Sequence, residues 1–310
     1  MGRPGRIDAS ASALVAAGLW GGMYVISKDT FAAVPPLTLA VLRMLVAGAA
    51  LVIALALAGS LRRPPRDGRL VLASVALAAT LIVQFVGTDL ATATQAALLT
   101  TTTPLFLVPF AWAGLRERPT WPTVGGILAG MAGVVVAVGP GAGRAGSRWG
   151  PLLLLASAML WATYTVASAR AARRDGPLVT VTWATIGAIP PLALASLLEV
   201  DRWGSASLTH LPTLGAIAYL GLAASAGAWY LWNRGVAGLP AAVAGAFFFA
   251  QPVVGGILAW LLLGERPTVR LGLGALLIVV GVLLALRATS RQAPPDEGQT
   301  DVPPDRDRVG

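Results

Sequence analysis

Residues 112–120 read WAGLRERPT, and residues 260–268 read WLLLGERPT. The glutamates of the two stretches are 148 residues apart. The same offset aligns four further pairs: Trp112 with Trp260, Pro104 with Pro252, Gly126 with Gly274 and Gly133 with Gly281. The chain therefore contains an internal duplication.

A second match lies nearer the start of each half. Leu19-Trp20 aligns with Leu160-Trp161 at an offset of 141 residues. Because the later pairs are 148 residues apart, the second half must contain a longer segment. We expect this segment in the loop around 199–210.

The composition excludes a water-soluble fold. Of the 310 residues, 56% are hydrophobic and 12% are charged, and the mean hydropathy is +0.73. Soluble domains carry about 25% charged residues. Ten apolar runs are long enough to cross a bilayer as helices, which takes ~17–25 residues. They lie near 10–28, 37–58, 70–88, 93–113, 122–139, 151–168, 178–198, 212–232, 240–263 and 269–286.

The runs are continuous and do not alternate, so they predict helices and an all-α integral membrane protein. Its ten transmembrane helices form two five-helix repeats, residues 10–139 and 151–287, joined by a loop at 140–150. An odd number of spans per half gives the halves opposite membrane polarity. Such inverted repeats suit alternating access. We expect residues 1–9 to be a cytoplasmic N-terminus and 288–310 a disordered cytoplasmic tail.

The first run follows Arg3 and Arg6 and could be a signal peptide. Its length and the similar runs after it favour an uncleaved first helix. The net charge is +9, and the basic residues form short clusters between apolar runs. With the N-terminus inside, the inner loops hold most arginines, so both termini are expected to be cytoplasmic in the cell membrane. The same placement argues against a nucleic-acid partner.

The duplicated pattern resembles the drug/metabolite transporter superfamily, in its ten-helix group with two EamA domains. The resemblance covers roughly residues 10–286. It rests on Leu19-Trp20-Gly21-Gly22, on Arg43, on Pro104 and Pro252, and most on the Glu-Arg-Pro-Thr turns at 117–120 and 265–268. It implies secondary transport, usually efflux, of amino acids, other small metabolites or drugs, through a central cavity between the halves.

Arg43 is the most informative polar residue, since it lies inside a span without a neighbouring charge. A charge within the bilayer usually faces protein or a water-filled cavity. One hypothesis makes Arg43 a gate or the partner of a substrate carboxylate. The alternative is a structural arginine that bonds helix ends or extends to the membrane interface.

A cavity for an amphipathic metabolite needs aromatic walls and a few oriented polar groups. Pro104 and Pro252 each free a carbonyl within a span, beside Thr103 and Gln251, and broken helices often hold transporter sites. Taken singly, most such side chains are equally explained by interface belts or by bonds within their own helix. The cavity candidates are Trp20, Tyr24, Arg43, Gln84, Thr103, Trp161, Tyr164, Tyr230 and Gln251.

Two other motifs favour structural interpretations. Each Glu-Arg-Pro-Thr turn is explained by a proline that starts the following helix. Gly126-x-x-x-Gly130 indicates close helix packing. We expect this packing inside the bundle, in preference to a contact between two chains of a dimer.

Several function classes are excluded. The chain has no cysteine and one histidine, His210, so we expect no catalytic residues, metal site or cofactor. No phosphate-binding loop is present. No acidic residue lies deep in a span, which argues against proton coupling through a buried carboxylate. The sequence does not identify a coupling ion. We predict a non-enzymatic exporter of a small metabolite, monomeric or homodimeric. The alternatives are an uptake permease and, less favoured, a membrane enzyme or lipid-handling scaffold. An amino acid, an organic anion and an amphipathic drug fit equally well.

Overall fold

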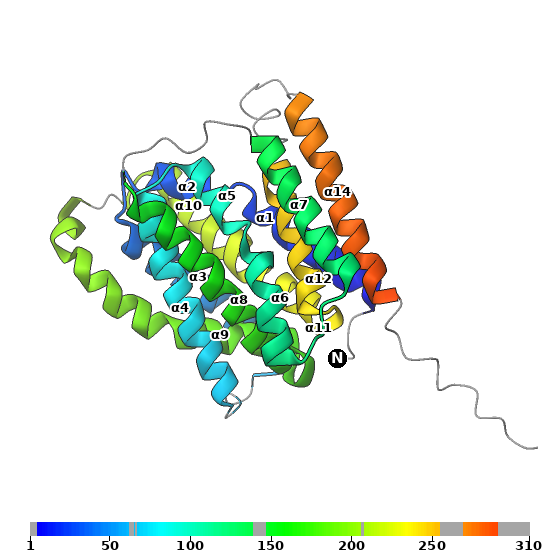
Figure 1. Cartoon of the computed structure of the whole chain (residues 1–310). Helices are drawn as coiled ribbons and strands as arrows, with labels where there is room; N and C mark the ends of the chain where they lie inside the picture. The colour runs from blue at the N-terminus through cyan, green and yellow to red at the C-terminus, as the bar shows by residue number, and fades with distance from the viewer. Residues whose placement is uncertain are drawn as a thin grey trace, which may run out of the picture.

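The computed structural model describes residues 5–61, 65, 67–138, 147–205, 208–254 and 269–290. Within these residues the chain is helical and contains no strand (Figure 1). The first half contains α1 (Arg6–Trp20), α2 (Met23–Thr30), α3 (Pro36–Leu57), α4 (Gly68–Asp89), α5 (Ala93–Thr100), α6 (Thr103–Leu115) and α7 (Trp121–Val138). The second contains α8 (Trp149–Asp175), α9 (Pro177–Ser196), η1 (Leu197–Ser205), α10 (Leu211–Ala218), η2 (Tyr219–Gly227), α11 (Ala228–Gly238), α12 (Ala241–Ala246), η3 (Phe247–Phe249) and α14 (Val269–Ser290).

Seven segments of the described chain are long and apolar enough to cross a bilayer. They are Arg6–Thr30, Pro36–Leu57, Gly68–Asp89, Gln95–Leu115, Trp149–Asp175, Pro177–Trp203 and Leu211–Gly238. Three shorter apolar helices are Trp121–Val136, Ala241–Val254 and Gly272–Arg287. The prediction of an all-helical, multi-pass membrane protein is therefore confirmed.

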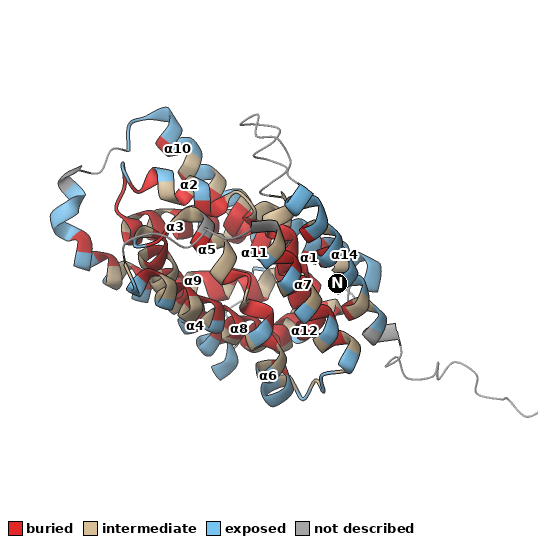
Figure 2. Cartoon of the chain, turned by 45° about the horizontal axis from the view of Figure 1, so that its top comes forward, coloured by how far each residue is buried: buried red, intermediate tan, exposed pale blue. Residues whose placement is uncertain are grey.

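Large apolar side chains cover the outer faces of the helices. Leu57 is 85% exposed, Val71 63% and Leu276 60%. Figure 2 shows the buried residues between the helices and the exposed ones along their outer faces. A water-soluble protein rarely exposes so much apolar surface, so this surface needs lipid as its solvent.

Helices of the first half pack mainly on helices of the second. The main pairs are α7 with α14, α4 with α8, α3 with α9, and α1 with α11. Figure 1 shows α7 and α14 side by side at one edge of the bundle. The core consequently contains side chains from both halves, such as Leu39 and Ala184.

The contact between α7 and α14 depends on glycines. A Cβ added at Gly126 would lie 2.4 Å from the Gly281 carbonyl oxygen, and one at Gly133 would lie 2.7 Å from that of Gly274. The helices are antiparallel, because the earlier glycine of α7 meets the later one of α14. Gly126 therefore contacts Gly281, the repeat counterpart of Gly133, and Gly133 contacts Gly274, the repeat counterpart of Gly126. The contact is intramolecular, as expected from Gly126-x-x-x-Gly130; Gly130 itself faces the Phe249 ring.

Two of the predicted spans break at equivalent points of the duplication. The span predicted at 93–113 breaks between α5 and α6, at residues 101–102 before Pro104. The span predicted at 240–263 turns from α12 into the 3-10 segment η3 before Pro252. Proline has no N–H to donate to the preceding turn, which weakens the helix there. A third break, at Gly21-Gly22 between α1 and α2, lies within the first candidate span, Arg6–Thr30.

Other boundaries also differ from the sequence prediction. α7 begins at Trp121, so Pro119 lies in the turn and Pro122 occupies the first helical turn. Part of the expected loop at 199–210 is the 3-10 segment η1. α8 begins at Trp149 and α14 continues to Ser290. The expected tail beyond 290, most of the 140–150 loop and the second Glu-Arg-Pro-Thr turn lie outside the described residues.

Charged groups join loops that the arginine distribution assigns to the same membrane side. On the expected inner side, three ion pairs are Arg173 with Glu117, Arg174 with Asp67 and Arg234 with Asp8. On the expected outer side, Lys28 donates to the Thr88 carbonyl, at 3.2 Å. Glu199 accepts from the backbone N–H of Thr38, at 3.0 Å.

Candidate functional site

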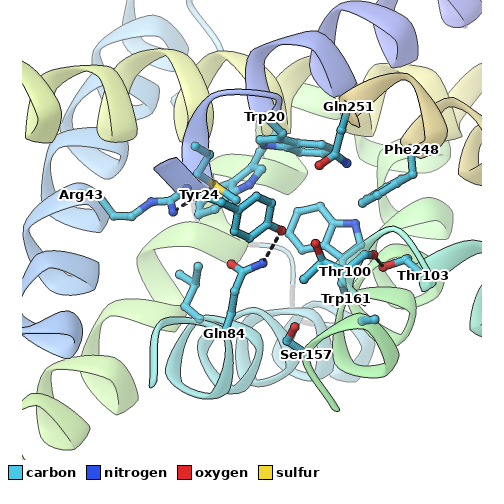
Figure 3. A pocket seen from close by; sticks show the side chains of 14 residues that line it. Trp20, Tyr24, Arg43, Gln84, Thr100, Thr103, Ser157, Trp161, Phe248 and Gln251 are labelled. Atoms are coloured by element: carbon cyan, nitrogen blue, oxygen red, sulfur yellow. Dashed lines mark hydrogen bonds between the residues drawn. The ribbon is translucent and has the colours of Figure 1, made fainter. Parts of the chain in front are cut away.

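A cavity lies between the two halves and is lined by fourteen residues (Figure 3). Seven of our nine candidates line it: Trp20, Tyr24, Arg43, Gln84, Thr103, Trp161 and Gln251. The remaining lining residues are Met23, Leu81, Thr100, Ser157, Ala158, Trp229 and Phe248. Eight of the fourteen come from the first half and six from the second.

The cavity is small. Its free volume is about 30 Å³, whereas a single water needs roughly 10–15 Å³ by the same measure. The space therefore holds about two waters and no metabolite. A ligand larger than this can enter only if the helices move apart.

Arg43, on α3, is 1% exposed and makes three hydrogen bonds. Its Nε donates to the Ser225 hydroxyl at 2.9 Å. Its two terminal nitrogens donate to the Met23 sulfur and the Ala224 carbonyl, both at 3.4 Å. Because Arg43 is buried to this degree, its side chain does not extend to the membrane interface.

The acceptors of Arg43 come from an opened helix. Ser225 and Ala224 belong to η2, a π-helical stretch in which the Ser225 hydroxyl donates to the Leu220 carbonyl, five residues back. The Ala224 carbonyl also accepts from the Trp20 indole, at 2.9 Å. π-helical turns are rare and frequently found at functional sites. Here the wide turn supplies polar groups to an otherwise apolar interface between the halves.

Rings form one wall of the cavity. The Trp20 and Trp161 rings meet edge to face, with centroids 5.3 Å apart at 85°. Phe248 lies 5.3 Å from Trp20. The Arg43 guanidinium lies 5.5 Å from the Trp229 ring centroid, within the range of a cation–π interaction. These surfaces suit an apolar or aromatic ligand body.

Several side chains besides Arg43 supply polar groups to the cavity. Gln84 donates to the Tyr24 hydroxyl at 3.0 Å. The Trp161 indole N–H and the Gln251 side-chain oxygen are buried and have no hydrogen-bond partner. Figure 3 shows the Gln251 oxygen pointing into the cavity. A buried polar group without a partner costs free energy, so a donor and an acceptor are available for a ligand.

The structure places two candidates outside the cavity. Tyr164 is fully buried behind Trp161, and its hydroxyl accepts from the Asn233 side chain at 2.8 Å. Tyr230 follows Trp229 on α11. Successive helical residues point about 100° apart, so when Trp229 faces the cavity Tyr230 does not.

Several lining residues that we did not select are paired with one another by the duplication. The offset of 148 residues pairs Thr103 with Gln251, and it equally pairs Thr100 with Phe248. It also pairs Leu81 with Trp229. Ser157 had no such signal, since residue 16 at the earlier offset is an alanine.

The first Glu-Arg-Pro-Thr turn forms a junction between the halves. One Glu117 oxygen accepts from Arg173 at 2.8 Å, and the other accepts from the backbone N–H of Ala241 at 2.7 Å, where α12 begins. Arg173 also donates to the carbonyls of Val236 and Leu239, at the end of α11. An open recess of about 430 Å³ lies beside this junction. These contacts give Glu117 a structural role, because it joins Arg173 and the start of α12.

We expect Ser225→Ala to destabilise the protein by about 1–3 kcal/mol, because it leaves the buried Nε of Arg43 without an acceptor. The measurement is thermal or denaturant unfolding in detergent. Ser74→Ala is the matched control, since the buried Ser74 hydroxyl bonds only to its own helix, at Leu70. Equal losses in the two variants would contradict a supporting role for Ser225.

A helical bundle with apolar outer faces and a small polar and aromatic cavity between its halves is typical of polytopic membrane transporters. The sequence matches the EamA-like transporter family twice, over residues 9–139 and 148–287. The chain belongs to this family, and each half is one copy of the family domain.

Relatives extend over most of the chain. The uncharacterized inner membrane transporter YedA of Escherichia coli (strain K12) is 29% identical over 261 residues, 80% of each chain. An uncharacterized transporter of Archaeoglobus fulgidus is 26% identical over 277 residues, 86% of this chain and 93% of that one. A protein crystal structure superposes with a TM-score of 0.77 at 26% identity, covering 93% of this chain and 100% of the other. The protein is a multi-pass membrane transporter with a small-molecule substrate.

Proposed function

We propose that the protein exports a small metabolite, such as an amino acid or a related compound, or a drug, by alternating access. The transporter would have ten transmembrane helices in two inverted five-helix repeats, with both termini in the cytoplasm. The observation that carries the proposal is the cavity, because both halves line it. A site at the interface of two repeats can open to either side as the repeats rock.

Two contacts support the inversion. The glycine contact joins α7 and α14 in an antiparallel manner, and these helices are equivalent in the duplication. The ion pairs of the expected inner side join Glu117, Asp67 and Asp8 to arginines of the other half. Both follow if each half crosses the membrane five times.

The mechanism requires the cavity to widen, because its free volume of about 30 Å³ is too small for a metabolite. The helix breaks beside Thr103 and Gln251 lie at the cavity wall. The first span breaks there too, at Gly21-Gly22 next to Trp20. The outer parts of these spans can then move while the inner parts stay packed, or the reverse.

The test is transport by the purified protein in sealed vesicles. Vesicles are loaded with amino acids, organic acids or amphipathic cations, and release is followed against empty vesicles. Substrate-dependent flux supports the proposal, and no flux for any class would contradict it. Proteolysis of each terminus in the same vesicles gives the orientation, so inward and outward rates can be compared for export and uptake.

We expect Trp161→Phe to weaken binding or transport of the substrate found in this screen by about three- to tenfold, because it removes the free indole donor. Trp183→Phe is the matched control, since its indole N–H is also buried without a partner but lies outside the cavity residues. A loss of the same size in both variants would remove Trp161 from the site.

A further inference from the structure

The charge balance of the cavity identifies its ligand more narrowly than its shape does. Arg43 is the one charged residue among the fourteen that line it. The ion pairs formed by the described residues all lie elsewhere. Moving an ion from water into a protein interior costs several kcal/mol unless it is paired. The cavity therefore contains a buried cation, Arg43, without a counter-ion among the described lining.

The hydrogen bonds of Arg43 are also incomplete. A guanidinium has five N–H donors, and Arg43 uses three of them. Its acceptors are neutral, and one is a thioether sulfur, which accepts weakly. A carboxylate could take two parallel N–H bonds, which makes such pairs stronger than bonds to neutral acceptors.

The rest of the cavity suits an organic anion better than an inorganic one. Figure 3 shows Arg43 on one side, Phe248 and Gln251 on the other, and Tyr24 and Trp161 between them. An anionic group at Arg43 would direct the remainder of the ligand onto these rings. A small inorganic ion would leave the aromatic wall and the free Trp161 donor unused.

We infer that the cavity selects a small organic carboxylate with an apolar or aromatic body, held by Arg43 at its anionic end. As a statement about the transported substrate, this assignment rests on the proposed transport function. Neutral and cationic compounds of the same size lack the group that compensates the Arg43 charge.

The test compares carboxylates with their uncharged primary amides on the purified protein. The pairs are phenylacetate with phenylacetamide, indole-acetate with indole-acetamide, and hexanoate with hexanamide. Binding is measured by quenching of tryptophan fluorescence and by thermal stabilisation, because a ligand that binds the native state stabilises it. We expect the carboxylate to bind about tenfold more tightly than its amide, as for a hydrogen bond to a charged group.

Arg43→Gln should abolish this preference. The matched control is Arg148→Gln, since Arg148 also stacks on a tryptophan ring, 5.3 Å from Trp149, but lies outside the cavity. If Arg43→Gln does not fold, the wild-type pairs still decide the matter. Amides that bind as tightly as their carboxylates, or no binding by any carboxylate, would overturn the assignment.

Flux in vesicles separates this inference from the transport proposal. Neutral compounds that cross while carboxylates neither bind nor cross would refute the anion site and leave the transporter intact. Carboxylates that bind through Arg43 to a protein that transports none of the tested compounds would support the site and refute the transport proposal.

Discussion

Gly126→Val is expected to destabilise the protein by about 3 kcal/mol or more, the upper range for overpacked sites. A Cβ at this position would meet the Gly281 carbonyl at 2.4 Å and the Ala285 amide nitrogen at 2.9 Å. Both contacts are with backbone, so no side-chain rotation can relieve them. The helices α7 and α14 would have to separate. The loss is measured as a lowered unfolding midpoint in detergent.

The adjacent glycine provides the control. A Cβ at Gly125 would find nothing within 4 Å, so Gly125→Val should change stability by less than about 0.5 kcal/mol. Gly133→Val should behave like Gly126→Val, because it meets the Gly274 carbonyl at 2.7 Å. Similar stability of the Gly125 and Gly126 variants would refute the close contact of the two helices.

Glu117→Ala is expected to open the end of the bundle that contains the Glu117–Arg173 junction. It removes the partner of Arg173 and the acceptor at the start of α12 together. A hydrogen bond to a charged group contributes about 1.5–3 kcal/mol. Side chains here are 24% and 18% exposed, and solvent screens such pairs, so we take the lower part of that range. A shift of about 1.4 kcal/mol changes the ratio of open to closed molecules about tenfold.

Thiol labelling can measure this change, since the chain contains no cysteine. Ala244 on α12 is fully buried, so a cysteine placed there reacts only when the end opens. Glu117→Ala should raise its labelling rate about tenfold, in line with the population shift. Glu199→Ala is the control, because Glu199 accepts from a backbone N–H near the start of α3, on the expected outer side. Equal increases in the two variants would mean that the whole protein is destabilised, and that the Glu117 junction does not specifically hold this end closed.

The family and the membrane class could be predicted from the sequence, because they depend on apolar runs and short motifs that need no knowledge of tertiary contacts. A span needs a run of about 20 apolar residues, and a helix satisfies its own backbone hydrogen bonds. The duplicated turn at 117–120 then aligned the halves. Arg43 was found in the same way, since a charge inside a span stands out without any knowledge of its neighbours.

Side-chain direction and helix breaks were harder to predict. Tyr230 and Trp229 are neighbours in sequence, yet only Trp229 reaches the cavity, because the rotation of α11 is fixed by its packing on α1 and α8. The break at Gly21-Gly22 was also missed. Glycine weakens a helix without requiring a break, so the neighbours decide.

By itself, the sequence determined the membrane environment, the helical class and the duplication, because each follows from the local pattern of apolar residues and from self-similarity. Only the tertiary structure decided which groups meet. It brought Arg43 to the carbonyl of Ala224, 181 residues away, through the wide turn of η2. It also left Trp161 and Gln251 without partners inside one cavity. The physical reason is that lipid constrains the length and polarity of each span, whereas packing between the halves sets its rotation, its breaks and the partners of its buried polar groups.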